Sequence, residues 1–334
     1  MTLRRLGLRV TGSDADPARA VRALELGALD EVGLDPEADI TFVAVPVGSI
    51  PEEVARALES TGGLVTDVGS VKGSITDAVD SPRFVGGHPM AGSEQEGVEG
   101  ADADLFEGAV WVLTPTPTTD DDAFAAVRSV VSSMGADVVA IPPDRHDALV
   151  AVVSHVPHLA AATLMHLADE RAEEHRALLR LAAGGFRDMT RIAAGHPGIW
   201  PDICAENRSA IVDMLDRLIA GLSDMRAAVD KADRDALLSV LERAQLARRN
   251  LPARVSHPDQ LCEVRVPVQD RAGVLADVTT LAAELDVSIA DLEIAHSSEG
   301  ERGVLILLVP AERAERFQGG LLARGYRPAV RTLE

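Results

Sequence analysis

The stretch DITFVAVPVGSIPEEVARALESTGGLVTDVGSVKG, residues 39–73, decides the fold class of this 334-residue chain. Residues 39–47 form a nearly continuous apolar run, as expected of a strand whose sheet is covered on both faces. A helical pattern follows at residues 52–58, and residues 63–71 pass from a second strand into a glycine-bounded loop. Strand, helix and strand in this order predict an open, mostly parallel α/β sheet that binds ligands at the carboxyl ends of its strands.

The same alternation extends to both sides of this stretch. Residues 8–31 (LRVTGSDADPARAVRALELGALDE) predict a short strand, a turn and a helix, which is the second half of a dinucleotide-binding unit. Residues 83–94 (RFVGGHPMAGSE) and 109–116 (AVWVLTPT) add two strand-like segments. We therefore predict a Rossmann-like dinucleotide-binding domain over residues 1–143, incomplete at its N-terminal side.

The remainder of the chain predicts two further domains. Residues 144–253 carry long apolar stripes at helical spacing, which predict an all-helical domain with enough apolar surface for a homodimer interface. Residues 252–260 (PARVSHPDQ) are a short linker. Residues 261–334 alternate as strand, helix, strand, strand, helix and strand, which is the ferredoxin-like α+β order.

Composition limits the possible partners. A formal net charge of −21 argues against nucleic acid as a partner, and it requires that any anionic substrate be held by locally placed arginine or histidine. No apolar run approaches the ~20 residues of a membrane span, and the start is not a secretory signal. We expect a cytoplasmic protein without membrane contact. The two cysteines have no metal-ligand spacing, and we expect no metal.

Polar residues after the predicted strands are candidates for a cofactor site. Asp14 follows an apolar strand, where an acid accepts hydrogen bonds from the adenosine ribose of NAD and repels the extra phosphate of NADP. Asp14 could instead cap the next helix, although Asp16, just before a proline, fits that role better. Val45 and Pro46 lie at the end of the strand predicted at residues 39–47. Ser70 lies in a loop that could also be a plain tight turn.

Histidines and arginines supply candidates for acid–base chemistry and anion binding. His88 lies between a strand end and a glycine-containing turn, where it could accept a proton near neutral pH or serve only the structure. His155 and His158 share a helix face and are more suited to lining a cleft than to binding zinc. Arg191 suits a substrate carboxylate, with a surface ion pair as the alternative.

Six segments together resemble the prephenate dehydrogenase family: VAVPV, TDVGSVKG, GGHPMAGSE, LFEGAVWVLTP, HDALVAVVSHVPH and GGFRDMTRIAAGHPGIWPDICAENR. The resemblance covers residues 8–250 with the segments in the family's order. It implies oxidation of prephenate with NAD, with release of carbon dioxide, to give 4-hydroxyphenylpyruvate on the route to tyrosine.

By match to the family motifs, His88 accepts the proton of the substrate ring hydroxyl and Ser70 contacts the same region. Arg191 matches the residue that binds a substrate carboxylate. The remaining matches line or gate the pocket, and they are His158, Glu94, Gly184 and Trp200.

The C-terminal segment VQDRAGVLADVTTLAAELDVSIADLEI, residues 268–294, resembles an ACT domain, an amino-acid-sensing module. The resemblance implies tyrosine as the effector, with Asp270 and Gly273 as contacts, because backbone N–H groups at a helix start can hold a carboxylate. The alternative is that this domain only mediates dimerisation.

The start of the chain departs from the family pattern, which opens with a strand and a GxGxxG-type loop. Residues 2–7 (TLRRLG) resemble the last turn of the helix that follows that loop. We expect the natural start to lie roughly 25–30 residues upstream, the size of a strand–loop–helix unit. The alternative is a real truncation.

Three other functions remain open. An arogenate dehydrogenase would have the same motifs. A regulatory protein with an inactive dehydrogenase part would bind tyrosine and not NAD. Another hydroxyacid dehydrogenase is disfavoured by the segment around His88, because those enzymes commonly use a lysine base in the helical domain.

Overall fold

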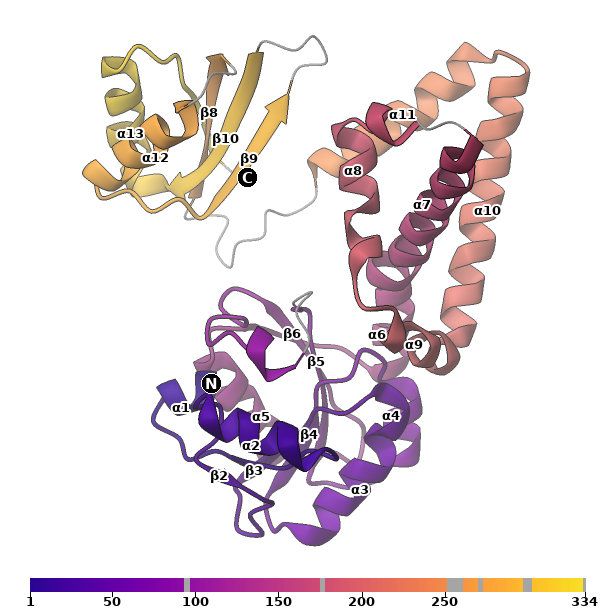
Figure 1. Cartoon of the computed structure of the whole chain (residues 1–334), viewed down its shortest axis with the longest axis vertical. Helices are drawn as coiled ribbons and strands as arrows, with labels where there is room; N and C mark the ends of the chain where they lie inside the picture. Colours follow the sequence, from indigo (N-terminus) through magenta and orange to yellow (C-terminus); the bar gives the residue numbers. More distant parts are fainter. Residues whose placement is uncertain (93–96, 175–177, 251–260, 270–272, 297–301, 333–334) are drawn as a thin grey trace. The chain divides into compact units, whose positions relative to one another are not determined.

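The computed structural model describes residues 1–92, 97–174, 178–250, 261–269, 273–296 and 302–332. The chain divides into two compact units, Met1–Leu237 and Leu238–Glu334. The first unit contains an α/β part and a helical part, and the second contains a smaller sheet (Figure 1).

The α/β part is built on a five-stranded sheet in the order β3-β4-β5-β6-β7. Strands β3, β4 and β5 are parallel, β6 runs antiparallel to β5, and β7 is parallel to β6. The predicted open, mostly parallel sheet is therefore confirmed. The strands are β3 (Ile40–Val43), β4 (Leu64–Asp67), β5 (Phe84–Pro89), β6 (Val110–Thr114) and β7 (Asp137–Ala140).

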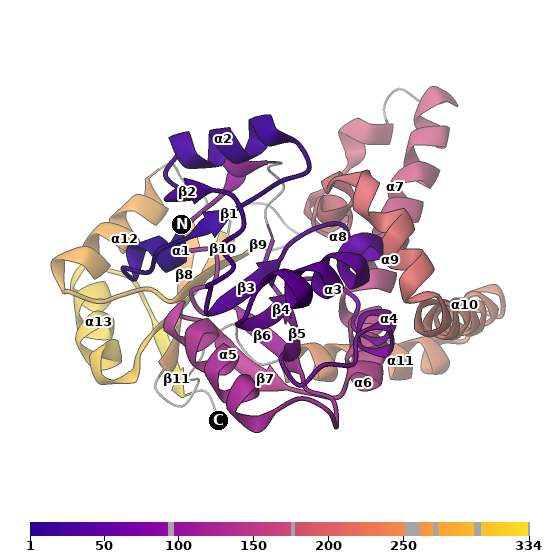
Figure 2. The same ribbon diagram turned by 90° about the horizontal axis from the view of Figure 1, so that it is seen from below.

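Helices cover both faces of this sheet, as Figure 2 shows. Helices α3 (Ile50–Ser60) and α4 (Gly73–Ala78) lie on one side, and α5 (Asp121–Ser133) lies on the other. On the first side, Ile50, Val54 and Ile75 pack against strand residues in one buried cluster. On the other side, α5 packs into a second cluster with β5 and β6. Burial on both faces explains why the central strands are apolar without alternation.

The N-terminal elements form a separate parallel pair of strands, β1 (Thr11–Gly12) and β2 (Glu31–Val32). The strand predicted at residues 8–10 begins only at Thr11. At Val10 the backbone N–H donates to the Asp30 carboxylate at 2.9 Å, and the backbone oxygen accepts from the Asp30 N–H at 2.8 Å. The other elements of this region are α1 (Thr2–Arg5) and α2 (Pro17–Glu25).

Asp16 caps α2, as the sequence predicts. Its side chain accepts a hydrogen bond from the Ala18 N–H at 2.9 Å, and Pro17 occupies the first helical position. Proline is favoured there because its missing N–H would have no partner inside the helix. Asp14 is therefore not the capping residue of this helix.

The part of the first unit that follows the sheet is helical throughout its described residues, as expected. The helix α6 (Pro143–Val150) continues through a π-helical turn η3 (Ala151–His155) into α7 (Val156–Glu174). The remaining elements are η4 (Leu178–Leu181), α8 (Gly184–Thr190), η5 (Arg191–Ala194), η6 (Pro197–Ile199), α9 (Trp200–Glu206), α10 (Arg208–Asp230) and the first residues of α11 (Arg234–Arg249); the α/β part also has η1 (Val47–Ser49) and η2 (Val98–Gly100).

One helical run qualifies the expectation that no segment could span a membrane. By length and composition alone, Pro143–Arg171 is long and apolar enough to do so. Within this run, however, His146 and Asp147 are buried and hydrogen-bonded to the α/β part. These bonds are those of a helix packed within a globular unit.

The second unit contains a four-stranded antiparallel sheet in the order β11-β8-β10-β9. Helices α12 (Val274–Glu284) and α13 (Ala311–Ala323) share one buried cluster with this sheet. The element order confirms the ferredoxin-like prediction. The strands are β8 (Leu261–Gln269), β9 (Asp291–His296), β10 (Arg302–Pro310) and β11 (Ala329–Thr332). The predicted linker at 252–260 lies outside the described residues.

Candidate active site

Asp67, the last residue of β4, organises the loop that follows the strand. Its Oδ2 accepts a hydrogen bond from the Gly69 N–H at 2.9 Å and forms an ion pair with Lys72 Nζ. Its Oδ1 accepts a hydrogen bond from the Gly87 N–H at 3.1 Å, directly before His88 on β5. Both charged side chains are fully buried. Desolvation lowers the pKa of Lys72, and the charge of Asp67 opposes this effect. One carboxylate thus fixes two neighbouring segments of the site.

Strands β4 and β5 approach so closely that Gly87 has no room for a side chain. A Cβ atom there would lie 2.6 Å from the backbone oxygen of Asp67 and 3.0 Å from Thr66 Oγ1. The first contact is with backbone, which cannot move aside as a flexible side chain can. Glycine is therefore required in order to seat His88 at this point of the sheet.

His88 lies at the carboxyl end of β5 and is only 8% exposed. Its Nδ1 is 2.8 Å from His146 Nε2. Desolvation lowers the pKa of His88 well below its usual value, and the charges of His146, Lys72 and His155 lower it further. His88 is consequently uncharged at neutral pH and can accept a proton.

His146 and Asp147, on the first turns of α6, connect the helical part to the sheet. The Nδ1 of His146 is 2.8 Å from Asp147 Oδ1. The Asp147 carboxylate also accepts hydrogen bonds from the N–H groups of Lys72 and Gly73, each at 2.8 Å. Both bonds are made to the loop that carries Ser70, which is half-buried. Helix α6 therefore holds this loop in place beside His88.

A π-helical turn brings a further polar pair next to this network. Asn207 Nδ2 donates to the backbone oxygen of Asp147 at 2.9 Å and lies 3.1 Å from His155 Nδ1. Burial lowers the pKa of His155 to about 4, with Asp147 acting in the opposite direction. Single π-turns in helices often occur at functional sites, and this one ends at His155.

His158 and Trp200 lie in direct contact. Their rings stack with centroids 3.6 Å apart and an interplanar angle of 15°, and His155 packs edge-on against the same indole. Burial lowers the pKa of His158, so the stacked ring is uncharged at neutral pH. The structure thus brings together two residues that the family resemblance predicts to line or gate one pocket.

Two further predicted substrate residues, Arg191 and Gly184, lie on elements that contact α7. Arg191 begins η5, which packs against α7, the helix of His158. Its side chain is exposed. Gly184 begins α8 and is also exposed. Glu94 lies outside the described residues.

The predicted cofactor residues follow the carboxyl ends of three strands, β1 of the two-stranded sheet and β3 and β4 of the five-stranded sheet. Asp14 comes two residues after β1 and is exposed, with its Oδ1 accepting a hydrogen bond from the Asp16 N–H at 2.8 Å. Val45 and Pro46 follow β3 and are exposed. Ser70 follows β4. These positions suit the two ends of a dinucleotide, the ribose at Asp14 and the nicotinamide near Ser70.

Helix α9 of the helical part packs against the α/β part close to the predicted cofactor residues Val45 and Pro46. Trp200 and Ile203 of α9 pack into the same cluster as Val43 and Val47, which flank Val45 and Pro46.

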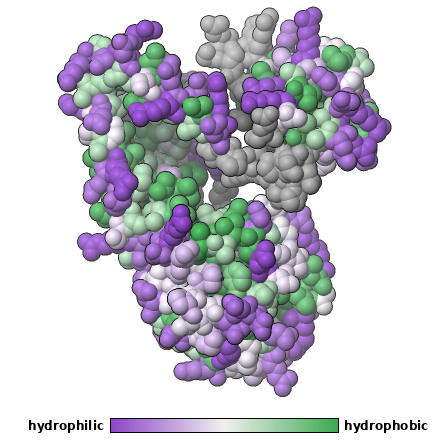
Figure 3. Space-filling model, turned by 180° about the vertical axis from the view of Figure 1, so that it is seen from behind, coloured by the Kyte–Doolittle hydropathy of each residue, from purple (hydrophilic) through white to green (hydrophobic). Residues whose placement is uncertain are grey.

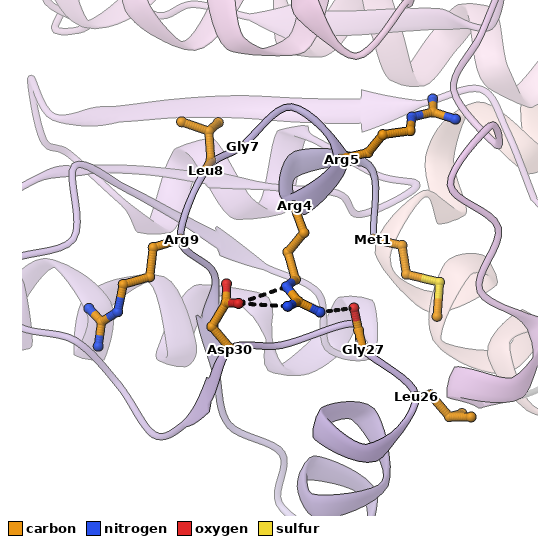
Figure 4. Close-up of a pocket in the computed structure, with 9 residues that line it drawn as sticks. All are labelled: Met1, Arg4, Arg5, Gly7, Leu8, Arg9, Leu26, Gly27 and Asp30. Atoms are coloured by element: carbon orange, nitrogen blue, oxygen red, sulfur yellow. Dashed lines mark hydrogen bonds and ion pairs between the residues drawn. The ribbon is translucent and has the colours of Figure 1, made fainter.

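A separate pocket of about 710 Å³ opens among the N-terminal elements (Figure 4). None of its lining residues belongs to the predicted site. Its Arg4 guanidinium is held by the Asp30 carboxylate at 2.7 Å, and it also donates to the Gly27 backbone oxygen. We assign it no part in the chemistry. It is lined by Met1, Arg4, Arg5, Gly7, Leu8, Arg9, Leu26, Gly27 and Asp30.

In the second unit, Gly273 has a left-handed backbone (φ +92°) at the N-terminus of α12. Asp270, the other predicted effector contact, lies outside the described residues. Gly273 therefore stands in the predicted position at a helix start, where its lack of a side chain permits this conformation.

Sequence reasoning missed four residues of the buried network. Asp67 follows an apolar strand, and the adjacent pair His146 and Asp147 opens a helix, so position after a strand or at a helix start could have identified these three. Asn207 gave no such signal, since its role depends on a contact with the backbone of Asp147 60 residues earlier.

Comparison with known proteins identifies the family. The sequence model described as "Prephenate dehydrogenase, nucleotide-binding domain" matches residues 1–140, and "Prephenate dehydrogenase, dimerization domain" matches residues 142–243. A prephenate dehydrogenase of Bacillus subtilis is 34% identical over 313 residues, which are 90% of this chain and 84% of the relative.

Two solved structures are similar to three quarters of this chain. One is a prephenate dehydrogenase from Aquifex aeolicus in complex with hydroxyphenyl propionate and NAD+ (TM-score 0.70, 30% identity, 75% of this chain and 92% of the other). The other is an arogenate dehydrogenase from Synechocystis (TM-score 0.65, 28% identity, 75% and 94%). With its nucleotide-binding and dimerisation regions both matched in order, the chain belongs to the prephenate dehydrogenase family.

Proposed function

We propose that this chain catalyses the NAD-dependent oxidative decarboxylation of prephenate to 4-hydroxyphenylpyruvate, a step of tyrosine biosynthesis. The observation that carries the proposal is His88, a histidine kept uncharged by burial at the carboxyl end of a central strand. Family membership and the similar structure with bound NAD+ support the cofactor.

The reaction needs a base and a hydride acceptor. Bound NAD supplies the acceptor for the hydride that leaves the ring carbon bearing the hydroxyl group. His88 accepts the proton of that hydroxyl group, and the Ser70 hydroxyl hydrogen-bonds in the same region. Carbon dioxide then leaves with its bonding electrons remaining in the ring, which becomes aromatic, and the resulting phenolate takes up a proton. A well-placed general base contributes ~10²–10⁴-fold to such a rate.

Prephenate carries two carboxylates, and a chain of net charge −21 must offset their negative charge with positive side chains in the pocket. Arg191 is proposed to bind one of them, because a guanidinium can hold a carboxylate with two parallel hydrogen bonds. The stacked rings of His158 and Trp200 form a wall of the pocket. Glu94 and Gly184 are proposed to line the same pocket by match to the family.

At the cofactor side, Asp14 is proposed to accept hydrogen bonds from the adenosine ribose, with Val45, Pro46 and Ser70 near the nicotinamide. A carboxylate at the end of this strand disfavours the 2′-phosphate of NADP by charge repulsion. We therefore propose NAD as the preferred cofactor.

Arogenate is the second candidate substrate. The similar Synechocystis structure is an arogenate dehydrogenase. Arogenate differs from prephenate in carrying an amino group in place of the side-chain keto group. A carboxylate near the substrate side chain would favour arogenate.

We further propose a cytoplasmic homodimer with an ACT-type regulatory domain over residues 261–334, after a nucleotide-binding domain over 1–143 and a helical domain over 144–253. Large apolar residues on the helical part are exposed in the single chain, and Figure 3 shows green residues among the purple ones on that part. They include Val153, Leu167, Ile219, Leu222 and Val229. Tyrosine, the pathway product, is the proposed effector at Gly273 and Asp270.

The test is the initial rate of NADH formation with NAD, or of NADPH formation with NADP, measured with prephenate and with arogenate. The proposal expects the highest kcat/KM for prephenate with NAD. A higher value for arogenate would transfer the assignment to that substrate. Tyrosine binding without turnover of either substrate would support the regulatory alternative.

A further inference from the structure

Three buried side chains form a continuous line from α6 to the proposed base. Asp147 Oδ1 lies 2.8 Å from His146 Nδ1, and His146 Nε2 lies 2.8 Å from His88 Nδ1. His146 is fully buried, and the other two side chains belong to residues no more than 9% exposed. Asp147 and His146 both lie in the family-like segment HDALVAVVSHVPH, residues 146–158, but the motif match gave neither of them a role.

The chemistry of the first member sets the direction of the hydrogen bonds along this line. An ionised carboxylate only accepts, so the ring proton of a neutral His146 is at Nδ1. Its Nε2 then carries a lone pair and accepts. His88 must therefore donate from Nδ1, which leaves the lone pair of His88 at Nε2, on the side away from His146.

The Asp147 carboxylate also accepts hydrogen bonds from two backbone N–H groups. Its Oδ1 also accepts from the Lys72 N–H and its Oδ2 accepts from the Gly73 N–H, each at 2.8 Å. Hydrogen bonds from backbone N–H groups favour the ionised carboxyl group. These two hydrogen bonds fix the orientation of the Asp147 carboxylate.

From this geometry we propose that Asp147 and His146 are positioning residues that hold His88 in the tautomer with a free Nε2 lone pair. The inference rests on the proposed function, in which this lone pair accepts the proton of the substrate hydroxyl group. Once His88 is protonated, its Nδ1–H still donates to His146, so the product of proton transfer is stabilised without rearrangement. The opposite tautomer would present an N–H to the hydroxyl oxygen and could not act as a base.

Other charged groups near Asp147, His146 and His88 also affect the charge and the tautomer of His88. Lys72 and His155 both disfavour a positive charge on His88, and Lys72 is itself neutralised by Asp67. A protonated His146 would donate from Nε2 to His88 and reverse the tautomer. The negative charge of Asp147 and the dry surroundings together favour the arrangement in which the proton of His146 stays at Nδ1.

A direct test is a two-bond ¹H–¹⁵N correlation spectrum of the protein labelled at histidine with ¹⁵N, with His88 assigned from the spectrum of His88→Asn. The expected result is a protonated Nδ1 and an unprotonated Nε2 on His88 at neutral pH. A protonated Nε2 would overturn the proposal. This result requires neither turnover nor a folded His146 variant.

Kinetics test the consequence for the reaction. His146→Leu is expected to lower kcat by about 10²-fold, the lower end for loss of an effective general base, while KM for substrate and NAD stays near the wild-type value. His146→Gln, whose amide oxygen can accept from His88 Nδ1–H, is expected to recover most of that loss. The control is His166→Leu, an exposed histidine on the same helical run, which should leave kcat unchanged.

The experiments distinguish a failure of the proposed function from a failure of the positioning role of Asp147 and His146. If wild-type protein shows the expected tautomer but oxidises neither prephenate nor arogenate, the proposed function fails and the tautomer assignment stands. If it oxidises prephenate and His146→Leu keeps the wild-type kcat, the positioning role is contradicted and the function stands. An equal loss with His146→Gln would also contradict the positioning role.

Discussion

His146 Nε2 lies 2.8 Å from His88 Nδ1 and thereby joins helix α6 to the end of strand β5. The rings meet nearly edge to face, with an interplanar angle of 73°. Because Asp147 binds the loop after β4 as well, three segments meet at one base. The geometry of His88 therefore depends on the packing of the helical part against the sheet.

Replacement of the base should separate catalysis from binding. His88→Asn is expected to lower kcat by ~10²–10⁴-fold, because asparagine cannot accept the proton. NAD affinity, measured by titration calorimetry, should remain near the wild-type value. A variant with the wild-type kcat would refute the assignment of His88.

Loss of the proposed carboxylate ligand should act mainly on substrate binding. Arg191→Ala is expected to raise KM for prephenate about 10- to 100-fold, the equivalent of one hydrogen bond to a charged group. Arg191→Lys should recover only part of this loss, because an ammonium cannot form the paired bonds.

Arg187→Ala is the matched control, since Arg187 is an exposed arginine of the neighbouring helix α8. It should leave KM unchanged. An equal rise in KM for both variants would point to a general loss of positive charge and contradict a specific role for Arg191.

The pH dependence of activity should reflect the lowered pKa of His88, which is surrounded by His146, Lys72 and His155. The base is active when neutral, so kcat/KM should persist as the pH falls through 6.5 and decline only below it. A pH profile of kcat/KM measures this directly. A decline centred at or above pH 6.5 would contradict the burial argument.

Stability should depend on pH in the same direction. The pKa values of His88 and His155 are lower in the folded chain than the usual value of the unfolded one. The unfolded chain therefore binds more protons below about pH 6.5, and the free energy of unfolding should fall as the pH falls. In urea titrations at several pH values, His88→Asn should show a shallower decline than the wild type.

Removing one partner of the buried Asp67–Lys72 ion pair should destabilise the fold strongly, because it leaves the other charge buried without a partner. Asp67→Asn is expected to lower the free energy of unfolding by ~3–5 kcal/mol, because the Lys72 charge is left buried without a partner. Asp67→Asn combined with Lys72→Met should cost less than the sum of the two single changes. Denaturant titration measures both quantities.

Glu52→Gln serves as the control for this pair, because it breaks an exposed pair with Arg56 at 3.3 Å on α3. Its expected cost is only about 0.3–0.5 kcal/mol. If Asp67→Asn were as mild as Glu52→Gln, the pair would not hold the loop in the way described.

Gly87→Ala should disturb the sheet next to the base. The added Cβ atom would lie 2.6 Å from the Asp67 backbone oxygen, so β4 and β5 must move apart. Both the melting temperature and kcat should fall. Gly62→Ala is the control, since its Cβ atom would lie 4.0 Å from the nearest heavy atom, and it should change neither quantity.

The sheet, the helical part and the ferredoxin-like unit could be predicted because each depends on local periodicity. The continuous apolar run at residues 39–47 indicated a covered sheet, and Pro17 with Asp16 marked the start of α2. The start of β1 at Thr11 could not be predicted, since the surroundings of Val10 include the side chain of Asp30, 20 residues later.

In the candidate site, too, features set by the local sequence could be predicted and features set by long-range contacts could not. His88 could be predicted from its own surroundings in the sequence, at the end of a strand and before a glycine-containing turn. Its dependence on His146 could not, because the two residues are 58 positions apart and meet only when α6 packs against the sheet. Likewise, the Lys72–Asp67 pair becomes a buried contact only through the fold of the loop.

The most direct test of the central claim is the stoichiometry of the reaction with prephenate and NAD, in which NADH, carbon dioxide and 4-hydroxyphenylpyruvate are each quantified. The account predicts equal amounts of all three products from the wild-type protein. NADH formation without carbon dioxide, or no NADH formation that depends on prephenate, would contradict it.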